Sequence, residues 1–273
     1  MVRYIQILGR QKRPLRFLIS RALRLTGLYR SIYMDFGDYK LRLHPSSLSL
    51  ALWVDKRDRG GDCSVVRSLL RKGETYVDIG ANIGQLVMEG VASVGESGKV
   101  FAFEAHPRIA GYLRENLELN GAENVRVAQV AVGDRFGWAS FSDGRSDDQN
   151  KIAGDGIFVP MVRLSSFFEN EKIDLLKIDV EGYEKFVLMG LGDSLNNTSI
   201  VYFEVMDAHF HGAGYSFRDV HSLLTDKGFQ IFAMNGERIR EVHQNEKFPV
   251  CLNLFATRDA ESLCQKLGAS RGA

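Results

Sequence analysis

The chain of 273 residues has few of the residues that mark specialised protein classes. Its 3 cysteines, Cys63, Cys251 and Cys264, are scattered without C-x-x-C spacing, which favours neither a zinc site nor a disulfide framework and indicates a reducing compartment. With only 5 prolines, 45% hydrophobic and 25% charged residues, the composition argues against a low-complexity or disordered chain. The formal net charge of +1 is too small for the field of the whole chain to attract a nucleic acid.

Long apolar runs and internal repeats are absent as well. No hydrophobic stretch approaches the roughly 20 residues that a membrane span requires, and no period typical of repeat proteins is visible. The length fits one large domain, or one domain with an appended segment. We therefore expect a globular, cytoplasmic protein, and the sequence leaves open whether it forms a homo-oligomer.

Acidic residues are missing from the first part of the chain, Met1 to Met34, where eight arginines and lysines alternate with leucine, isoleucine and phenylalanine. One interpretation is an amphipathic helix that makes a peripheral contact with anionic lipid. The other is a helical cap that packs its apolar side on the main domain and leaves its basic side in water. The segment has no small-residue cleavage site of a secretory signal.

Short runs rich in valine, isoleucine and phenylalanine alternate with helical patterns over most of the chain. Expected strands are 76–80, 99–104, 125–133, 173–180, 199–205, 229–234 and 250–257, and expected helices include 64–71, 107–119, 181–191 and 217–227. This alternation predicts an α/β fold with a doubly wound, mainly parallel sheet. A small hairpin is expected within 33–50. We therefore divide the chain into a basic extension of helices and a hairpin at 1–72, packing on a main domain at 73–273.

The turn after the first expected strand reads Asp78-Ile79-Gly80-Ala81-Asn82-Ile83-Gly84. In a parallel sheet ligands bind at such turns. Gly80 and Gly84 would let the backbone bend and a ligand approach it, and free N–H groups at the helix start would favour an anion. Glu104 ends the next strand, and its carboxylate suits the two hydroxyls of a ribose. The dinucleotide spacing G-x-G-x-x-G is absent, so the turn by itself leaves a purely structural role open.

Several segments in the same order resemble the FkbM family of S-adenosylmethionine-dependent methyltransferases: "VDIGANIG", "VFAFEAHP", "NLELNGAENVRVAQVAVGD", "LLKIDVEGYEKFVLMG" and "FEV". The resemblance spans about 73–256, and "KIDVEG" is similar to the family's hallmark. Ala105 and His106 stand where members often have Pro after the ribose-binding Glu, and Gln85 stands where an aromatic residue is frequent.

The resemblance implies a Rossmann-like class I methyltransferase fold and S-adenosylmethionine as cofactor. It places Gly80, Ala81 and Asn82 at the methionine end, Glu104 on the ribose, and Gly133 with Asp134 by the adenine. Asp78 would contact the cofactor directly or through water. Asp134 has a second interpretation as a turn residue. The implied cofactor-binding residues are Asp78, Gly80, Ala81, Asn82, Gly84, Glu104, Ala105, Gly133, Asp134 and Asp179.

Four residues are candidates for catalysis: Asp179, Glu181, Glu204 and His209. Asp179 would hold the amino group of the cofactor or act as a base, and Glu181 is either catalytic or a first-turn acid of the following helix. His209 is a natural acceptor for a hydroxyl proton, unless it is a surface residue. A further hypothesis joins Asp179, Glu204 and Asp207 around Mg²⁺.

In line with the resemblance, the first hypothesis is an O-methyltransferase that acts on a hydroxyl of a sugar, glycolipid, polysaccharide or natural-product scaffold. Specificity is expected to lie in 142–159 and in the segment after Glu204. A nucleic-acid methyltransferase is disfavoured because no N-P-P-Y-like segment and no basic, aromatic groove is visible. The alternative from another class is a silent cofactor-binding module that docks on a membrane or a protein.

Overall fold

The computed structural model describes residues 28–141, 156–165, 167–168 and 171–272, together with Arg16, Ile19 and Leu23. Most of the basic lead and residues 142–155 of the expected specificity loop lie outside the described residues. No described helix combines the length and the apolar content needed to cross a bilayer.

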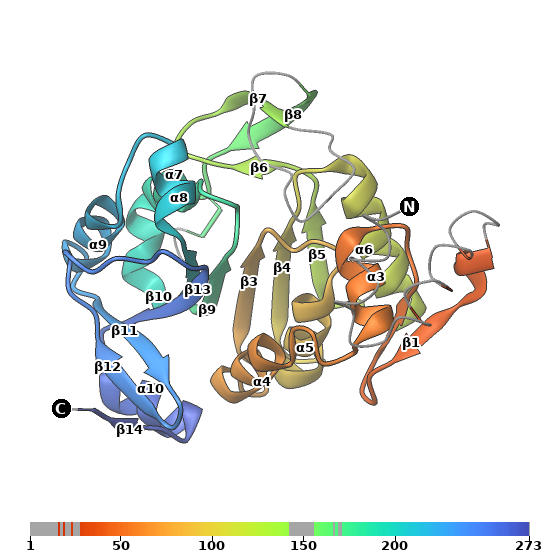
Figure 1. Cartoon of the computed structure of the whole chain (residues 1–273), viewed down its shortest axis with the longest axis horizontal. Helices are drawn as coiled ribbons and strands as arrows, with labels where there is room; N and C mark the ends of the chain where they lie inside the picture. Colours follow the sequence, from red (N-terminus) through yellow and green to blue (C-terminus); the bar gives the residue numbers. More distant parts are fainter. Residues whose placement is uncertain are drawn as a thin grey trace, which may run out of the picture.

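A nine-stranded sheet with the order β14-β12-β11-β13-β10-β9-β3-β4-β5 forms the centre of the molecule (Figure 1). β3 (Thr75–Ile79), β4 (Lys99–Phe103) and β5 (Val125–Ala128) run parallel and step outward in chain order. The chain then returns to the other side of β3, where β9 (Ile173–Ile178) and β10 (Thr198–Val205) continue the parallel part. The order therefore reverses between β3 and β9, which is where open α/β sheets bind ligands.

The C-terminal strands extend the sheet beyond β10. β13 (Leu252–Thr257) and β11 (Gln230–Asn235) pair antiparallel, β12 (Arg238–Glu241) follows antiparallel to β11, and the short β14 (Ser270–Arg271) is parallel to β12. The predicted α/β fold with a mainly parallel sheet is confirmed. The expected strand at 250–257 exists, but it enters the sheet against the direction of its neighbours.

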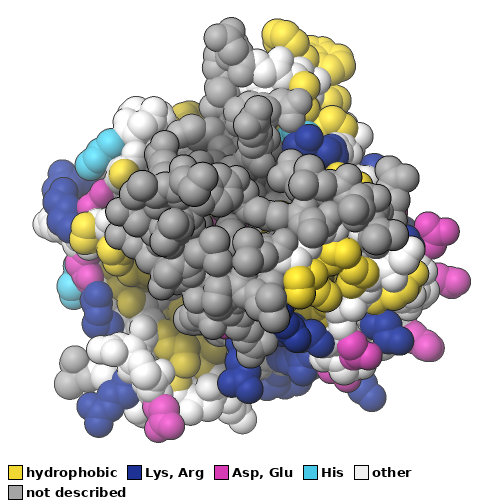
Figure 2. All heavy atoms as spheres, turned by 45° about the vertical axis from the view of Figure 1, so that its right-hand side comes forward, with side chains coloured by type: hydrophobic (Ala, Val, Ile, Leu, Met, Phe, Trp, Pro, Cys, Tyr) yellow, Lys and Arg dark blue, Asp and Glu magenta, His cyan; other side chains and the backbone are white. Residues whose placement is uncertain are grey.

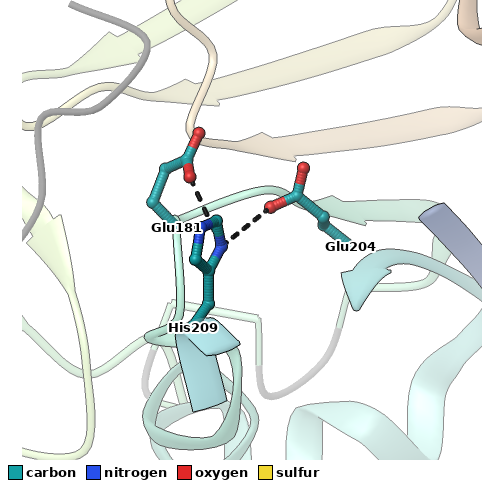
Figure 3. A group of neighbouring side chains, drawn as sticks. All are labelled: Glu181, Glu204 and His209. Carbon is teal, nitrogen blue, oxygen red and sulfur yellow. Dashed lines mark ion pairs between the residues drawn. The ribbon is translucent and has the colours of Figure 1, made fainter. Parts of the chain in front are cut away.

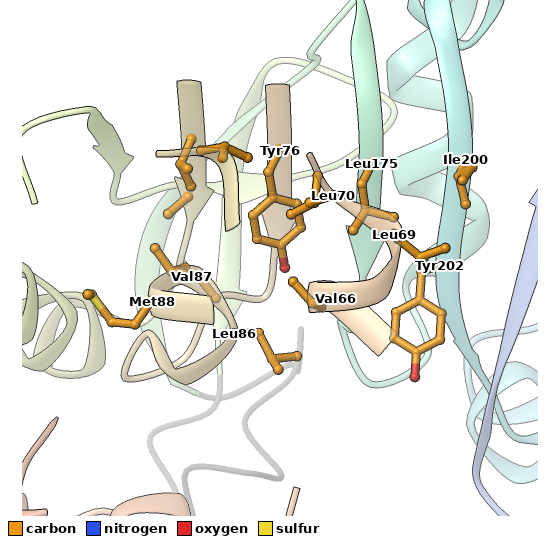
Figure 4. Packing of buried hydrophobic residues seen from close by; sticks show 14 of the residues in the cluster. Val66, Leu69, Leu70, Tyr76, Leu86, Val87, Met88, Leu175, Ile200 and Tyr202 are labelled. Atoms are coloured by element: carbon orange, nitrogen blue, oxygen red, sulfur yellow. The ribbon is translucent and has the colours of Figure 1, made fainter. Parts of the chain in front are cut away.

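Helices cover both faces of the sheet because successive strand residues point to opposite sides. Tyr76 and Leu175 pack with helices of one face, where Figure 4 shows them beside Val66 and Val87. The next residues in the same strands, Val77 and Leu176, pack with helices of the other face. The first set is α4 (Gly60–Leu69), α5 (Gln85–Val94), α6 (Pro107–Leu119) and α10 (Ala260–Leu267); the second is α7 (Glu184–Leu191) and α9 (Phe217–Thr225).

The N-terminal hairpin predicted from the sequence is present. β1 (Tyr33–Asp35) and β2 (Lys40–Arg42) pair antiparallel, and α3 (Ser47–Val54) follows. Two asparagines bind the edge of β2, Asn116 in α6 and Asn120 at its C-cap. Asn116 Oδ1 accepts from the Arg42 amide and Asn120 Oδ1 from the Lys40 amide, each at 2.8 Å. These bonds and shared core residues hold the hairpin against α6, while the domain boundary at residue 72 stays a prediction.

The expected strand at 125–133 is wrong in its length. It breaks after Ala128, and Ala131–Val132 forms β6 of a separate three-stranded sheet with β7 (Gly137–Phe141) and β8 (Ile157–Val162). β6 leaves the main sheet because it pairs with β8. Continuous hydrophobicity in the sequence does not reveal such a change of partner.

The outer face of this small sheet carries exposed aromatic side chains. Phe136, Trp138 and Phe158 are 62%, 69% and 74% exposed, and hydrophobic side chains gather at the upper edge of the molecule in Figure 2. Phe141, three positions after Trp138, points to the opposite side of β7 and lines the pocket described below. The aromatic surface therefore lies on the face of the three-stranded sheet that is turned away from that pocket.

Candidate active site

A pocket of ≈ 240 Å³ lies where β3, β4 and β9 end, at the reversal of the strand order. Its lining includes Gly80 and Asn82 after β3, Glu104 after β4, and Asp179 after β9. The N-terminal segment contributes through α3 and the turn before α4, so the extension completes the pocket. The residues from that segment are Ser47, Leu48, Ala51, Asp58 and Arg59, and those from the β5–β7 region are Val130, Ala131, Val132 and Phe141.

Five of the ten residues implied by the family resemblance line this pocket: Gly80, Asn82, Glu104, Ala105 and Asp179. The other five, Asp78, Ala81, Gly84, Gly133 and Asp134, lie outside its lining. The predicted turn therefore lies at the pocket, but of its five implied residues two, Gly80 and Asn82, line it and three do not.

The two glycines of the turn are required by neighbouring protein atoms. Gly80 and Gly84 have φ of 84° and 90°, a conformation that costs a residue with a Cβ roughly 1–2 kcal/mol. A Cβ on Gly80 would lie 1.8 Å from the carbonyl oxygen of Asp179, and one on Gly84 would lie 2.4 Å from Leu113 Cδ1. Both glycines therefore make room for β9 and α6, and since Gly80 also lines the pocket, close approach of a ligand to its backbone stays a prediction.

The backbone amides of the turn are already bonded. Gly80 and Ala81 both donate to the Phe103 carbonyl, Asn82 donates to Glu104, and Gly84 donates to the Ala81 carbonyl. The amides of these four residues are therefore not free to bind an anion, and free N–H groups at the start of α5 stay a prediction. The same bonds fasten the end of β3 to the end of β4, which fixes the geometry of the pocket floor.

Glu104 is the carboxylate at that junction. One oxygen accepts from the Asn82 amide and the other from the His106 amide, both at 2.9 Å, and only 8% of the residue is exposed. Burial raises the pKa of Glu104 to about 7, and the two backbone N–H groups oppose that shift. Each oxygen keeps a second acceptor site, so the fixed carboxylate can receive two further donors from a ligand in the pocket.

Asp78 lies beneath the turn and not in the pocket. It is fully buried, and its carboxylate accepts from Lys177 Nζ at 2.9 Å. Lys177 also donates to the Gly80 carbonyl at 3.1 Å. Burial would lower the pKa of Lys177, but Asp78 and Asp179 outweigh it and the pKa is raised. The predicted contact of Asp78 with the cofactor has no support from this position, and its visible role is to hold Lys177 beneath the turn.

Asp179 faces the pocket between two cations. Arg59 Nη1 lies 3.3 Å and Lys177 Nζ 3.6 Å from its Oδ2. Burial would raise the pKa of Asp179, but Lys177 and Arg59 outweigh it and the pKa is lowered, so the group stays ionised. Sequence analysis missed Arg59 and Lys177. Lys177 had a signal, because it is the one lysine inside the apolar strand "IDLLKI"; Arg59 had none.

Gly133 and Asp134 follow β6 and are displaced with it. A Cβ on Gly133 would lie 2.8 Å from Met161 Sδ, and its carbonyl is covered by Gly190 of α7. The pocket wall in this region is instead apolar, formed by Val130 and Val132. The adenine contact of Gly133 and Asp134 therefore stays a prediction, and the pocket lining does not include these two residues.

Glu181 lines the pocket and does not start a helix. Its φ is 54°, and α7 begins at Glu184. Glu184 is the first-turn acid that was considered for Glu181, and its Oε1 accepts from the loop amides of Val180 and Gly182 at 3.2 and 3.3 Å. The expected helix start at residue 181 is therefore wrong. Glu181 and Gly182 have positive φ and belong to the loop that precedes the helix.

Glu181, Glu204 and His209 come together beside the pocket (Figure 3). They belong to the loop after β9, the end of β10 and α8 (Asp207–Gly212). His209 Nδ1 lies 3.5 Å from Glu181 Oε2 and 3.7 Å from Glu204 Oε2. Gly182 permits this approach, since a Cβ there would lie 2.9 Å from the His209 carbonyl oxygen.

The hypothesis of a metal site made of Asp179, Glu204 and Asp207 is not supported. Asp207 Oδ2 accepts from the Phe248 amide at 2.9 Å and serves to hold the chain before β13. Within the described ranges, the group close enough to share an ion is Glu181, Glu204 and His209. Burial, followed by the charge of Asp179, raises the pKa of Glu204 to about 7.

Comparison with known proteins decides the family. Residues 78–231 match the methyltransferase FkbM domain, which is more than half of the chain. The chain belongs to the FkbM methyltransferase family. It is therefore an S-adenosylmethionine-dependent methyltransferase, and the resemblance seen in the sequence is confirmed.

Two curated relatives each cover more than half of this chain. The 2-O-methyltransferase NoeI of Sinorhizobium fredii is 28% identical over 182 residues, covering 58% of this chain and 74% of that protein. The hexuronic acid methyltransferase AglP of Haloferax volcanii is 26% identical over 209 residues, covering 71% of this chain and 78% of that protein. A solved putative rRNA methylase from Clostridium thermocellum covers 73% of this chain and 94% of its own at 13% identity, with a TM-score of 0.46. The fold assignment rests on the strand order given above.

Proposed function

We propose that this FkbM methyltransferase is an O-methyltransferase that modifies a hydroxyl of a sugar or of a sugar-bearing molecule. The names of the two relatives support the acceptor class, since one is a 2-O-methyltransferase and the other a hexuronic acid methyltransferase. The observation that carries the proposal is Glu181, which lines the cofactor pocket and also belongs to the cluster with Glu204 and His209. A proton acceptor thus stands beside the site of methyl transfer.

The pocket residues fit S-adenosylmethionine. Glu104 offers two fixed acceptor oxygens for the ribose hydroxyls, and Val130, Val132 and Phe141 offer an apolar wall for the adenine. Asp179, kept ionised by Arg59 and Lys177, offers a negative charge for the amino group of the cofactor. When bound, the cofactor supplies the electrophilic methyl group.

The protein must align the acceptor hydroxyl and help to remove its proton. Glu181 is positioned for this because its backbone is held in a left-handed conformation and its carboxylate is turned toward His209 (Figure 3). Glu204, nine-tenths buried at the end of β10, stands on the other side of the same imidazole nitrogen. We assign removal of the hydroxyl proton to this cluster.

The test is transfer of a labelled methyl group to a panel of acceptors that contains glucuronic and galacturonic acid glycosides, neutral hexose glycosides and bulk RNA. We expect an O-methylated sugar, with transfer reduced about 100-fold or more in Glu181→Gln, since general base catalysis contributes 10²–10⁴-fold. The affinity for S-adenosylmethionine should change less than about threefold, because binding of the cofactor depends on other residues.

Glu237→Gln is the matched control, because Glu237 is exposed and remote from the pocket. Its rate should equal that of the unmodified chain. Labelling of RNA with no labelling of any sugar would contradict the proposal.

A further inference from the structure

We propose that Glu181, Glu204 and His209 form a binding site for one divalent transition-metal ion of the Mn²⁺ or Zn²⁺ class. The proposed role of that ion in methyl transfer rests on the proposed function, but the site itself does not. This site shares Glu204 with the magnesium site that was considered from the sequence, but its other two ligands and its preferred ion are different.

The separations of the three side chains suit an ion. Bonds of about 2.1 Å to nitrogen and oxygen place neighbouring ligand atoms about 3.0 Å apart at right angles and about 3.4 Å apart in a tetrahedron. His209 Nδ1 lies 3.5 Å from Glu181 Oε2 and 3.7 Å from Glu204 Oε2, and the three ligand atoms all lie within 4.8 Å of one another. A small inward movement of flexible side chains would therefore complete the coordination.

Glu204 provides an independent reason to expect a cation. The residue is 9% exposed, and only its Oε1 accepts a hydrogen bond, from Cys251 Sγ at 2.8 Å. Its Oε2 points into the cluster (Figure 3) and accepts no hydrogen bond from any residue that the structure describes. A carboxylate on a residue this deeply buried is costly unless a positive partner faces it.

Nearby lysine and arginine side chains do not fill this role, and His209, 3.7 Å from Glu204 Oε2, does so only in its protonated form. Arg59 and Lys177 form their ion pairs with Asp179 and Asp78, and neither forms one with Glu204 among the residues that can be described. Their charges act on Glu204 only from a distance. An ion placed between Glu204 and Glu181 would face both carboxylates directly.

The ligand set indicates the class of ion. Mg²⁺ and Ca²⁺ prefer oxygen atoms alone, whereas an imidazole with two carboxylates suits Mn²⁺, Fe²⁺, Co²⁺ or Zn²⁺. Three protein ligands leave positions for another group, as in catalytic sites. Because Glu181 also lines the pocket, we expect those positions to face the acceptor. The ion would lower the pKa of a hydroxyl that it contacts, and the proton would pass to the carboxylate oxygen of Glu181 that does not bind the ion.

The test is calorimetry of Mn²⁺ binding to the chelator-treated full chain, together with melting temperatures at increasing Mn²⁺. We expect one ion per chain, at least tenfold weaker binding in His209→Gln and in Glu204→Gln, and a melting temperature that Mn²⁺ raises only in chains with the intact site. Mn²⁺ is used in place of Zn²⁺ so that the three cysteines do not add binding sites. Circular dichroism of the variants shows whether each is folded.

His211→Gln is the matched control, since His211 lies on the same helix α8 but is exposed and outside the cluster. It should bind Mn²⁺ as the unmodified chain does. Absence of Mn²⁺ binding, or equal binding by folded His209→Gln, would overturn the site. Methyl transfer to a sugar at full rate in excess chelator would refute the role of the ion and leave the proposed function standing. Mn²⁺ binding without transfer to any sugar would refute the function and leave the site standing.

Discussion

Glu104→Gln separates the role of this residue in cofactor binding from its role in folding. The substitution keeps the size of the side chain but replaces one acceptor oxygen by an amide donor. A hydrogen bond to a charged group contributes about 1.5–3 kcal/mol, so loss of one ribose contact should weaken S-adenosylmethionine about 10- to 100-fold. Calorimetric titration at pH 8 measures this loss directly.

The effect of Glu104→Gln on the stability of the fold should depend on pH. Because the pKa of Glu104 is raised to about 7 in the folded chain from an ordinary 4.5, the folded state binds more protons between these values, and the contribution of this group to stability falls as pH rises. Ionised Glu104 then costs roughly 3 kcal/mol at pH 8. Glutamine avoids that cost, although it leaves one of the Asn82 and His106 amides without its acceptor, at about 1–3 kcal/mol.

We therefore expect the melting temperature of Glu104→Gln to match that of the unmodified chain within a few degrees at pH 8 and to lie below it at pH 5. Glu118→Gln, on the exposed face of α6, is the control and should change neither affinity nor melting temperature. A folded Glu104→Gln that binds the cofactor within threefold of the unmodified chain would refute the assignment of Glu104 to the ribose.

Three further predictions concern the same end of the sheet. The affinity of the unmodified chain for S-adenosylmethionine should fall severalfold between pH 8 and pH 5.5, since Glu104 takes up a proton near pH 7, and titration of Glu104→Gln over the same range should show a much smaller change. Gly80→Ala should lower the free energy of unfolding by roughly 2–5 kcal/mol through backbone strain and overlap with Asp179. The melting temperature should therefore fall by about 5–15 °C, and an unchanged value would disprove that Asp179 requires a glycine here. Lys177→Met should lower the free energy of unfolding by about 3–5 kcal/mol because it leaves the buried Asp78 carboxylate without its cation. In denaturant unfolding, adding Asp78→Asn should recover part of this loss, whereas strictly additive losses would argue against the ion pair.

The sequence was sufficient for the parts of the fold that depend on local pattern. Continuous apolar runs predicted the parallel strands, and the glycine turn after β3 predicted where the pocket would lie. Glu104 could be found because it ends the strand that follows this turn. These features depend on neighbours in the chain or in the adjacent strand, which is the range over which a sequence pattern carries information.

Features that depend on distant contacts were missed or misplaced. Arg59 reaches Asp179 across 120 positions of the chain, and the break after Ala128 arises from pairing of β6 with β8. The sequence identified Glu181, Glu204 and His209 separately, but their meeting depends on how closely α8 approaches Gly182. The pairing of Asp78 with Lys177 could not be seen in the sequence because the two residues lie 99 positions apart.

The central claim is that the joined ends of β3 and β4 hold the ribose of an adenosyl cofactor. A crystal structure of the full chain with S-adenosylhomocysteine tests it most directly. We predict both ribose hydroxyl oxygens within about 2.5–3.0 Å of the Glu104 carboxylate, with the adenine against Val130 and Phe141. A ribose bound elsewhere, with Glu104 contacting only the Asn82 and His106 amides, would contradict the claim.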